Sequence, residues 1–128
     1  MRIFKTKAFD KFAQKNRISD RELYEAITRA EAGLIDADLG GNIIKQRLSG
    51  NQQGRRGGYR SFIFYRINEN CYFVAGISKN QRDNITAKEL SALKELAQEY
   101  LKLTTQQILM QIKHGYFIEI FPVHWKGF

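Results

Sequence analysis

Residues 59–77, YRSFIFYRINENCYFVAGI, decide the fold of this chain. The first nine are rich in aromatic and β-branched residues, with Phe62 and Phe64 on one side of a strand and Ile63, Tyr65 and Ile67 on the other. A strand that is apolar on both sides is expected at the centre of a sheet. A polar turn follows, and residues 71–77 are a near-continuous apolar run. The stretch therefore predicts an antiparallel hairpin in the core.

Upstream of this hairpin the pattern predicts two strands and two helices. Ser19 and Glu22 have the spacing of a capping box, in which each side chain bonds the other residue's backbone amide at the start of a helix. The glycines of the segment 39–42 break the pattern before the next strand. The predicted elements are strands at 3–7 and 43–48, a helical turn at 8–13 and a helix from 19 to about 33.

Downstream, Thr86 with Glu89 forms a second capping box, which predicts the start of a long helix. Thr104 offers another cap for a short helix that ends near Gly115. Residues 116–121 alternate like a strand, and Pro122 places that strand at a sheet edge. The order β-α-α-β-β-β-α-α-β predicts a single compact α+β domain, with an antiparallel or mixed sheet packed by helices.

Composition limits the class of protein. The chain has 128 residues, 43% of them hydrophobic and one of them proline, as expected for one folded domain. Cys71 is the only cysteine, so no internal disulfide can form. No stretch approaches the roughly 18 apolar residues of a membrane-spanning helix. We therefore expect a cytoplasmic protein with no membrane partner.

The positive charge is concentrated in one segment. The net charge is +8, and no Asp or Glu occurs between Leu39 and Asn68. Arginines interleaved with tyrosines suit phosphate binding and base stacking, so a polyanion such as nucleic acid is the expected partner. The six cations of this segment are Lys45, Arg47, Arg55, Arg56, Arg60 and Arg66.

Other chemistries lack sequence support. One cysteine and two histidines cannot build a structural zinc site, and no phosphate-binding glycine loop of the nucleotide-binding type occurs. If residues 43–48 pair with residues 59–67, Lys45 and Arg47 share one face beside Arg60. Lys79 and Arg82, which follow the next strand, are placed to reach the same edge. We expect no metal and no cofactor.

Three segments occur in a characteristic order: residues 44–50 (IKQRLSG), 58–65 (GYRSFIFY) and 73–80 (FVAGISKN). Together they resemble the RelE/HigB-like toxin superfamily. The resemblance covers about residues 1–120 and leaves 121–128 as a C-terminal extension of unknown role. It implies a compact RelE-like α+β domain, in agreement with the pattern above.

The resemblance implies the toxin of a type II toxin–antitoxin system. Such toxins cleave messenger RNA, commonly in the ribosomal A site, by attack of a ribose 2′-hydroxyl on the adjacent phosphate. The implied partners are mRNA, the ribosome and a cognate antitoxin, which we expect to carry a helix-turn-helix DNA-binding segment. Two alternatives stay open: a ParE-like toxin that inhibits DNA gyrase, and a nucleic-acid-binding module without catalysis.

The resemblance also assigns roles to residues. Arg60 matches the arginine that contacts the scissile phosphate. Of Lys45 and Arg47, one is expected to help activate the 2′-hydroxyl and the other to hold phosphate. Lys79 and Arg82 would stabilise charge or protonate the leaving oxygen. The expected RNA-binding residues are Arg55, Arg56, Tyr59 and Tyr65.

Several aromatic and basic residues of the chain also have a purely structural interpretation. The structural alternative for Tyr59 and Tyr65 is that both rings pack in the core. Arg66 is expected to pair with a helix carboxylate. HigB-like proteins often use histidine in their sites. His114 and His124, however, lie late in this chain, and we expect both at the surface.

Overall fold

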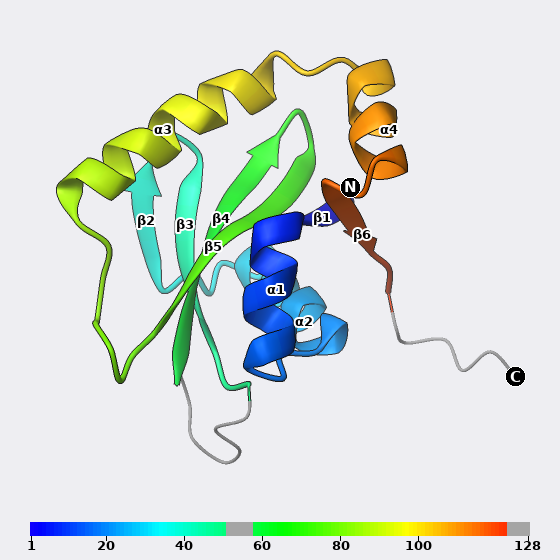
Figure 1. The fold of residues 1–128 in the computed structure, drawn as a ribbon. Coiled ribbons are helices and arrows are strands. Elements are labelled where there is room, and N and C mark those ends of the chain that lie inside the picture. Colours follow the sequence, from blue (N-terminus) through cyan, green and yellow to red (C-terminus); the bar gives the residue numbers. More distant parts are fainter. Residues whose placement is uncertain (51–57, 123–128) are drawn as a thin grey trace, which may run out of the picture.

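The computed structural model describes residues 1–50 and 58–122 and shows a mixed six-stranded sheet covered by helices on both faces (Figure 1). The strand order is β2-β3-β4-β5-β1-β6, and among these neighbours only β1 and β5 run parallel. The elements are β1 (Arg2–Thr6), α1 (Lys7–Lys15), α2 (Asp20–Glu31), β2 (Ala37–Gly40), β3 (Ile43–Leu48), β4 (Tyr59–Ile67), β5 (Asn70–Ser78), α3 (Ala87–Leu101), α4 (Thr105–Lys113) and β6 (Phe117–Ile120). The predicted α+β class is confirmed.

The strands β4 and β5 form the predicted antiparallel hairpin at the centre of the sheet, and β6 lies at an edge as expected. The strand β2 was not predicted. Gly40, Gly41 and Asn42 all have positive φ, and they turn the chain from β2 into β3. The glycines that indicated a break in the pattern therefore form the turn of a hairpin.

All three predicted helix caps are present, and one of them lacks its predicted reciprocal bond. The hydroxyls of Ser19, Thr86 and Thr104 each accept a hydrogen bond from the backbone amide three residues later. In α3 and α4 the reciprocal bond is also present. In α2 it is not, because the Glu22 carboxylate accepts from the backbone amides of Ser49 and Gly50 instead. The predicted capping box at Ser19 is therefore half formed.

Two apolar layers fill the space on either side of the sheet. The layer under α1 and α2 contains Phe9, Leu23, Ile63 and Phe73, and the layer under α3 and α4 contains Phe4, Phe64 and Tyr72. Gln46 is fully buried among the first group. Among the described residues, no helix is long and apolar enough to cross a membrane.

Candidate functional site

The contacts of two residues show which way the cations of β3 and β4 point. The Gln46 amide donates to the Ala26 carbonyl of α2 at 3.0 Å, and the Tyr59 ring packs edge-on against Phe12 of α1. Successive side chains of a strand point to opposite faces. Lys45, Arg47 and Arg60, next to these residues in sequence, therefore lie on the face away from α1 and α2.

The strand register brings these cations together. Arg47 is directly opposite Arg60, and Lys45 is opposite Phe62, one diagonal step from Arg60. Directly opposed side chains have Cβ atoms about 4.5–5.5 Å apart, and like charges in such pairs destabilise a sheet. The register therefore sets two guanidinium groups beside each other on one face of the sheet.

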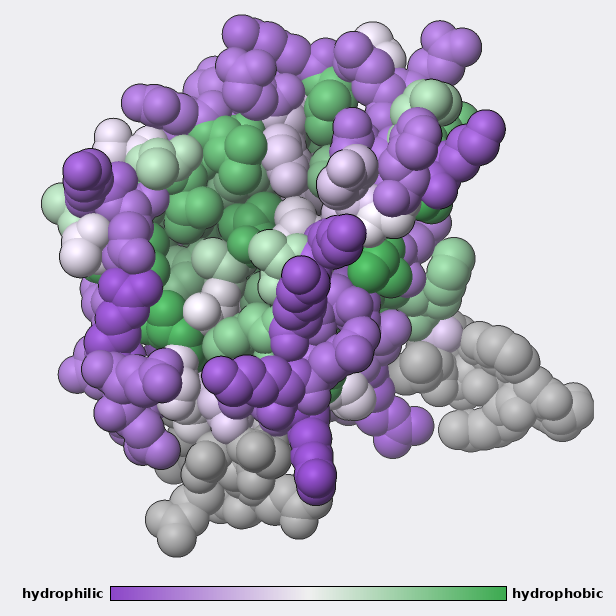
Figure 2. Space-filling model, viewed as in Figure 1, coloured by the Kyte–Doolittle hydropathy of each residue, from purple (hydrophilic) through white to green (hydrophobic). Residues whose placement is uncertain are grey.

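Among residues 1–50 and 58–122, no helix packs over this end of the sheet face. Leu90, Leu93 and Ala97 of helix α3 instead pack in the layer that holds Ile43 and Phe64, toward the other end of β3 and β4. Figure 1 shows α3 crossing the sheet there. Figure 2 shows, beside α3, a hollowed apolar surface ringed by hydrophilic side chains. Of the cations of β3 and β4, Arg47 is exposed and Lys45 and Arg60 are half-buried, so all three reach solvent.

Lys79 belongs to the same group. Its backbone amide donates to the Gly58 carbonyl at 3.0 Å, which extends the β4–β5 ladder one residue beyond Ser78. Ile77 pairs with Arg60, so Lys79, two residues later, lies diagonally from Arg60 on the same face. Its side chain is exposed.

Arg60 is half-buried, and its guanidinium donates to the Tyr59 carbonyl at 3.2 Å. Arg47 is more exposed, and its backbone amide donates to the Asp36 carboxylate at 2.7 Å. The Asp36 carboxylate also lies 3.9 Å from the Arg47 guanidinium. Asp36 is a site residue that the sequence did not reveal, because the contact depends on the unpredicted β2–β3 hairpin.

Arg82, which is predicted to stabilise charge or protonate the leaving oxygen, forms an ion pair with a helix carboxylate. Its guanidinium makes two hydrogen bonds to the Glu89 carboxylate, at 2.7 and 2.9 Å. Glu89 also accepts from the Thr86 amide at 2.7 Å as part of the cap of α3. Arg82 therefore ties the segment 79–86 to the start of α3, with its charge already matched by a carboxylate.

This ion pair predicts a pH dependence of stability. Arg82 holds the pKa of the Glu89 carboxyl at about 2, below the usual 4.5. A carboxyl whose pKa is lowered in the folded state stabilises the fold above its unfolded pKa, and this contribution is lost as the pH falls from about 4.5 toward 2. The melting temperature of the wild type should exceed that of Glu89→Gln at pH 7, and the difference should shrink toward pH 3. A difference that stays constant with pH would contradict the assignment.

The two tyrosines are not brought to the cationic face. Tyr59 is 3% exposed in the layer under α1 and α2, and Tyr65 packs against the same layer. The Tyr65 hydroxyl donates to Glu31, which also pairs with Arg66 at 2.7 Å. The expected pairing of Arg66 with a helix carboxylate is confirmed. A stacking role for either tyrosine beside Arg60 has no structural support.

The remaining candidates are placed as follows. Arg55, Arg56 and His124 lie outside the described residues. His114 is exposed at the end of α4, as expected. Within residues 1–50 and 58–122, no three His, Cys, Asp or Glu side chains group as metal ligands. Burial raises the pKa of the Cys71 thiol to about 11, so it is not a reactive thiolate.

The described residues form a small α+β protein with a mixed sheet, in which four cations group at one end of one face. The family model described as the RelE toxin of the RelE / RelB toxin-antitoxin system matches residues 1–120. The chain belongs to the RelE family and is a toxin of a toxin–antitoxin system, with a cognate antitoxin as partner. Searches of the curated proteins and of the solved structures gave no match.

Proposed function

We propose that this toxin is a metal-independent endoribonuclease that cuts mRNA on the ribosome. The observation that carries the proposal is the direct opposition of Arg47 and Arg60, with Lys45 and Lys79 one diagonal step from Arg60. Four cations around one point match the charge that develops on a phosphate under nucleophilic attack. Membership in the RelE family, whose toxins are generally ribonucleases, supports the same reaction.

In the proposed reaction, the ribose 2′-oxygen attacks the adjacent phosphorus and the bond from phosphorus to the 5′-oxygen breaks. The products are a 2′,3′-cyclic phosphate and a 5′-hydroxyl, so one proton leaves the 2′-oxygen and one reaches the 5′-oxygen. The protein then needs to supply alignment, charge stabilisation and proton transfer.

Each cation has a proposed role. Arg60, central in the group, binds the scissile phosphate with its planar guanidinium. Arg47 holds the phosphate from the neighbouring strand, because an arginine stays charged and cannot accept a proton. Lys45 activates the 2′-hydroxyl, and Lys79 protonates the leaving 5′-oxygen. Arg82 acts through Glu89 as a positioning residue for the segment that carries Lys79.

The proposal extends to partners. Arg55 and Arg56 are proposed to contact the RNA backbone outside the cleavage point. The antitoxin is proposed to carry a helix-turn-helix segment that binds DNA. A short reading frame for such a protein beside the toxin gene would support this part of the proposal.

Primer extension in a translating extract tests the function. We expect new 5′ ends within the translated region of a reporter mRNA, and 5′-hydroxyl and 2′,3′-cyclic phosphate termini on the fragments. The same mRNA without ribosomes should stay intact. Intact transcripts in cells whose growth the toxin stops would contradict the proposal, and DNA damage in those cells would indicate a gyrase inhibitor instead.

A further inference from the structure

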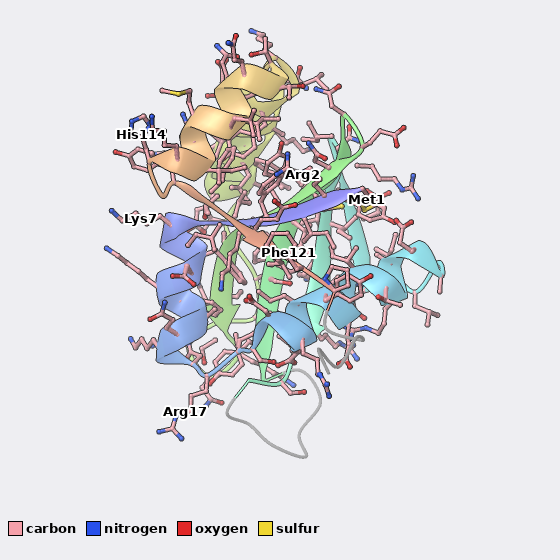
Figure 3. All side chains as sticks on the ribbon, turned by 90° about the vertical axis from the view of Figure 1, so that its right-hand side faces the viewer. Met1, Arg2, Lys7, Arg17, His114 and Phe121 are labelled. Carbon is pink, nitrogen blue, oxygen red and sulfur yellow. The ribbon has the colours of Figure 1, made fainter. Side chains whose placement is uncertain are left out.

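The outer surface of α1 carries a row of cations that the proposed cleavage site does not use. Lys7, Lys11 and Lys15 are spaced by four residues, so they follow one face of the helix at steps of about 6 Å. Arg17 follows two residues after the end of α1, and the side chains of Lys7, Lys11, Lys15 and Arg17 are all exposed. Figure 3 shows Lys7 at one end of α1 and Arg17 beyond the other, both pointing away from the sheet. We call Lys7, Lys11 and Lys15 the lysine row.

The fold leaves this row without acidic partners. The segment 7–21 has only two carboxylates, Asp10 and Asp20, and both bind the buried ammonium of Lys5 at 2.8 Å. Within the described part of the chain, no cation of the row has an ion pair. Like charges four residues apart destabilise a helix, so the row favours a bound polyanion.

An aromatic cavity lies at one end of the row. The cavity has a volume of about 530 Å³, and Lys7 and Lys11 line it together with Tyr116, Tyr100 and Gln111. Tyr116 is 54% exposed, and the Lys7 ammonium lies 5.8 Å from the centre of its ring. The Lys7 amide donates to the Tyr116 carbonyl at 3.0 Å, which holds the Tyr116 backbone beside the start of α1.

Lysines along a track and an exposed ring at its end are the two elements of single-stranded nucleic-acid binding. The lysines neutralise phosphates, and the ring stacks on a base. We propose that the lysine row and Tyr116 bind a stretch of single-stranded RNA outside the cleavage point. This inference rests on the proposed function in taking RNA as the ligand. Figures 1 and 2 support it, because α1 borders the hollowed surface beside α3.

Fluorescence anisotropy with a labelled 12-nucleotide RNA tests the inference. Its 2′-O-methyl groups remove the nucleophile, so binding is measured without cleavage. The triple variant Lys7→Ser, Lys11→Ser, Lys15→Ser should lower the slope of log affinity against log salt by about 2, since each phosphate contact on a single strand contributes about 0.7. Tyr116→Ser should weaken binding roughly 5- to 150-fold with little change in slope.

The control variant also removes three positive charges, but from α3 and its C-cap instead of α1. Lys88, Lys94 and Lys102 are exposed lysines of α3 and its C-cap, and their triple change to serine should lower the slope by less than about 1. Equal slopes for the two triple variants, or no binding by the wild type, would overturn the inference. Unchanged RNA affinity in the lysine-row variant would also overturn the inference, and would indicate that the row binds an acidic protein instead. All substituted side chains are exposed, and a melting curve checks that each variant folds.

Cleavage in the translating extract separates this inference from the proposed function. If the wild type cuts transcripts but the lysine row does not affect binding, only the second RNA surface is wrong. If binding depends on the row but the wild type does not cut, the second surface stands and the nuclease proposal fails.

Discussion

Replacing Arg60 with alanine is expected to lower the rate of transcript cleavage by about 100-fold or more. Arg60 stands between Arg47 on one neighbouring strand and Lys79 beyond the other, so it is the centre of the group. Loss of one preorganised donor to a developing charge costs about 100- to 1,000-fold in related chemistry. The rate would be measured by primer extension over time in a translating extract.

A matched control is available in β1. Arg2→Ala removes the same charge, but Arg2 pairs with Glu119 of β6 and lies outside the cationic group. Cleavage by this variant should stay close to that of the wild type. Arg60→Lys should give an intermediate rate, because a lysine keeps the charge without the planar pair of donors. Wild-type cleavage by Arg60→Ala would contradict the proposed site.

Replacing Gln46 with leucine is expected to lower the free energy of unfolding by about 3 kcal/mol, since each buried polar group left without a partner costs about 1–3 kcal/mol. The Gln46 side chain donates to the carbonyls of Ala26 and Leu34, at 3.0 and 3.1 Å. It also accepts from the Asp36 amide at 2.8 Å. Leucine has a similar size but makes none of these bonds. Urea unfolding measures the difference.

Gln98→Leu is the control, because Gln98 is exposed on α3. A surface change of this kind is expected within about 0.5 kcal/mol of the wild type. A loss at Gln46 no larger than at Gln98 would show that the buried bonds contribute nothing. Gln46 lies between Lys45 and Arg47 in β3, so its bonds to α2 also keep those cations on the opposite face.

Much of the fold follows from local pattern. The alternation of β3 and β4 and the apolar run of β5 were sufficient to predict three adjacent strands, and the threonine caps located α3 and α4. The placement of Lys45, Arg47 and Arg60 on one face also followed, because the period of a strand is two residues.

The structure departs from the predictions where contacts between distant segments override the local sequence pattern. Ile67 was predicted on the face of Ile63, but the β4–β5 register shifts after Phe64 and Arg66 has a φ of 60°. Ile67 therefore joins the layer under α3, and Arg66 reaches Glu31 of α2. A bulge of this kind depends on the pairing of two strands, which the sequence of one strand does not contain.

By itself, the sequence determined the α+β class, the central hairpin, most helix starts and the concentration of cations in one segment, because these depend on short-range periodicity and on residue type. Only the tertiary structure decided which charges remain available. It placed Tyr59 and Tyr65 on the far face, matched Arg82 with Glu89, and turned Asp10 and Asp20 inward to Lys5. The physical reason is that an ion pair or a buried ring depends on distance in space, and that distance is set by how the sheet and helices pack.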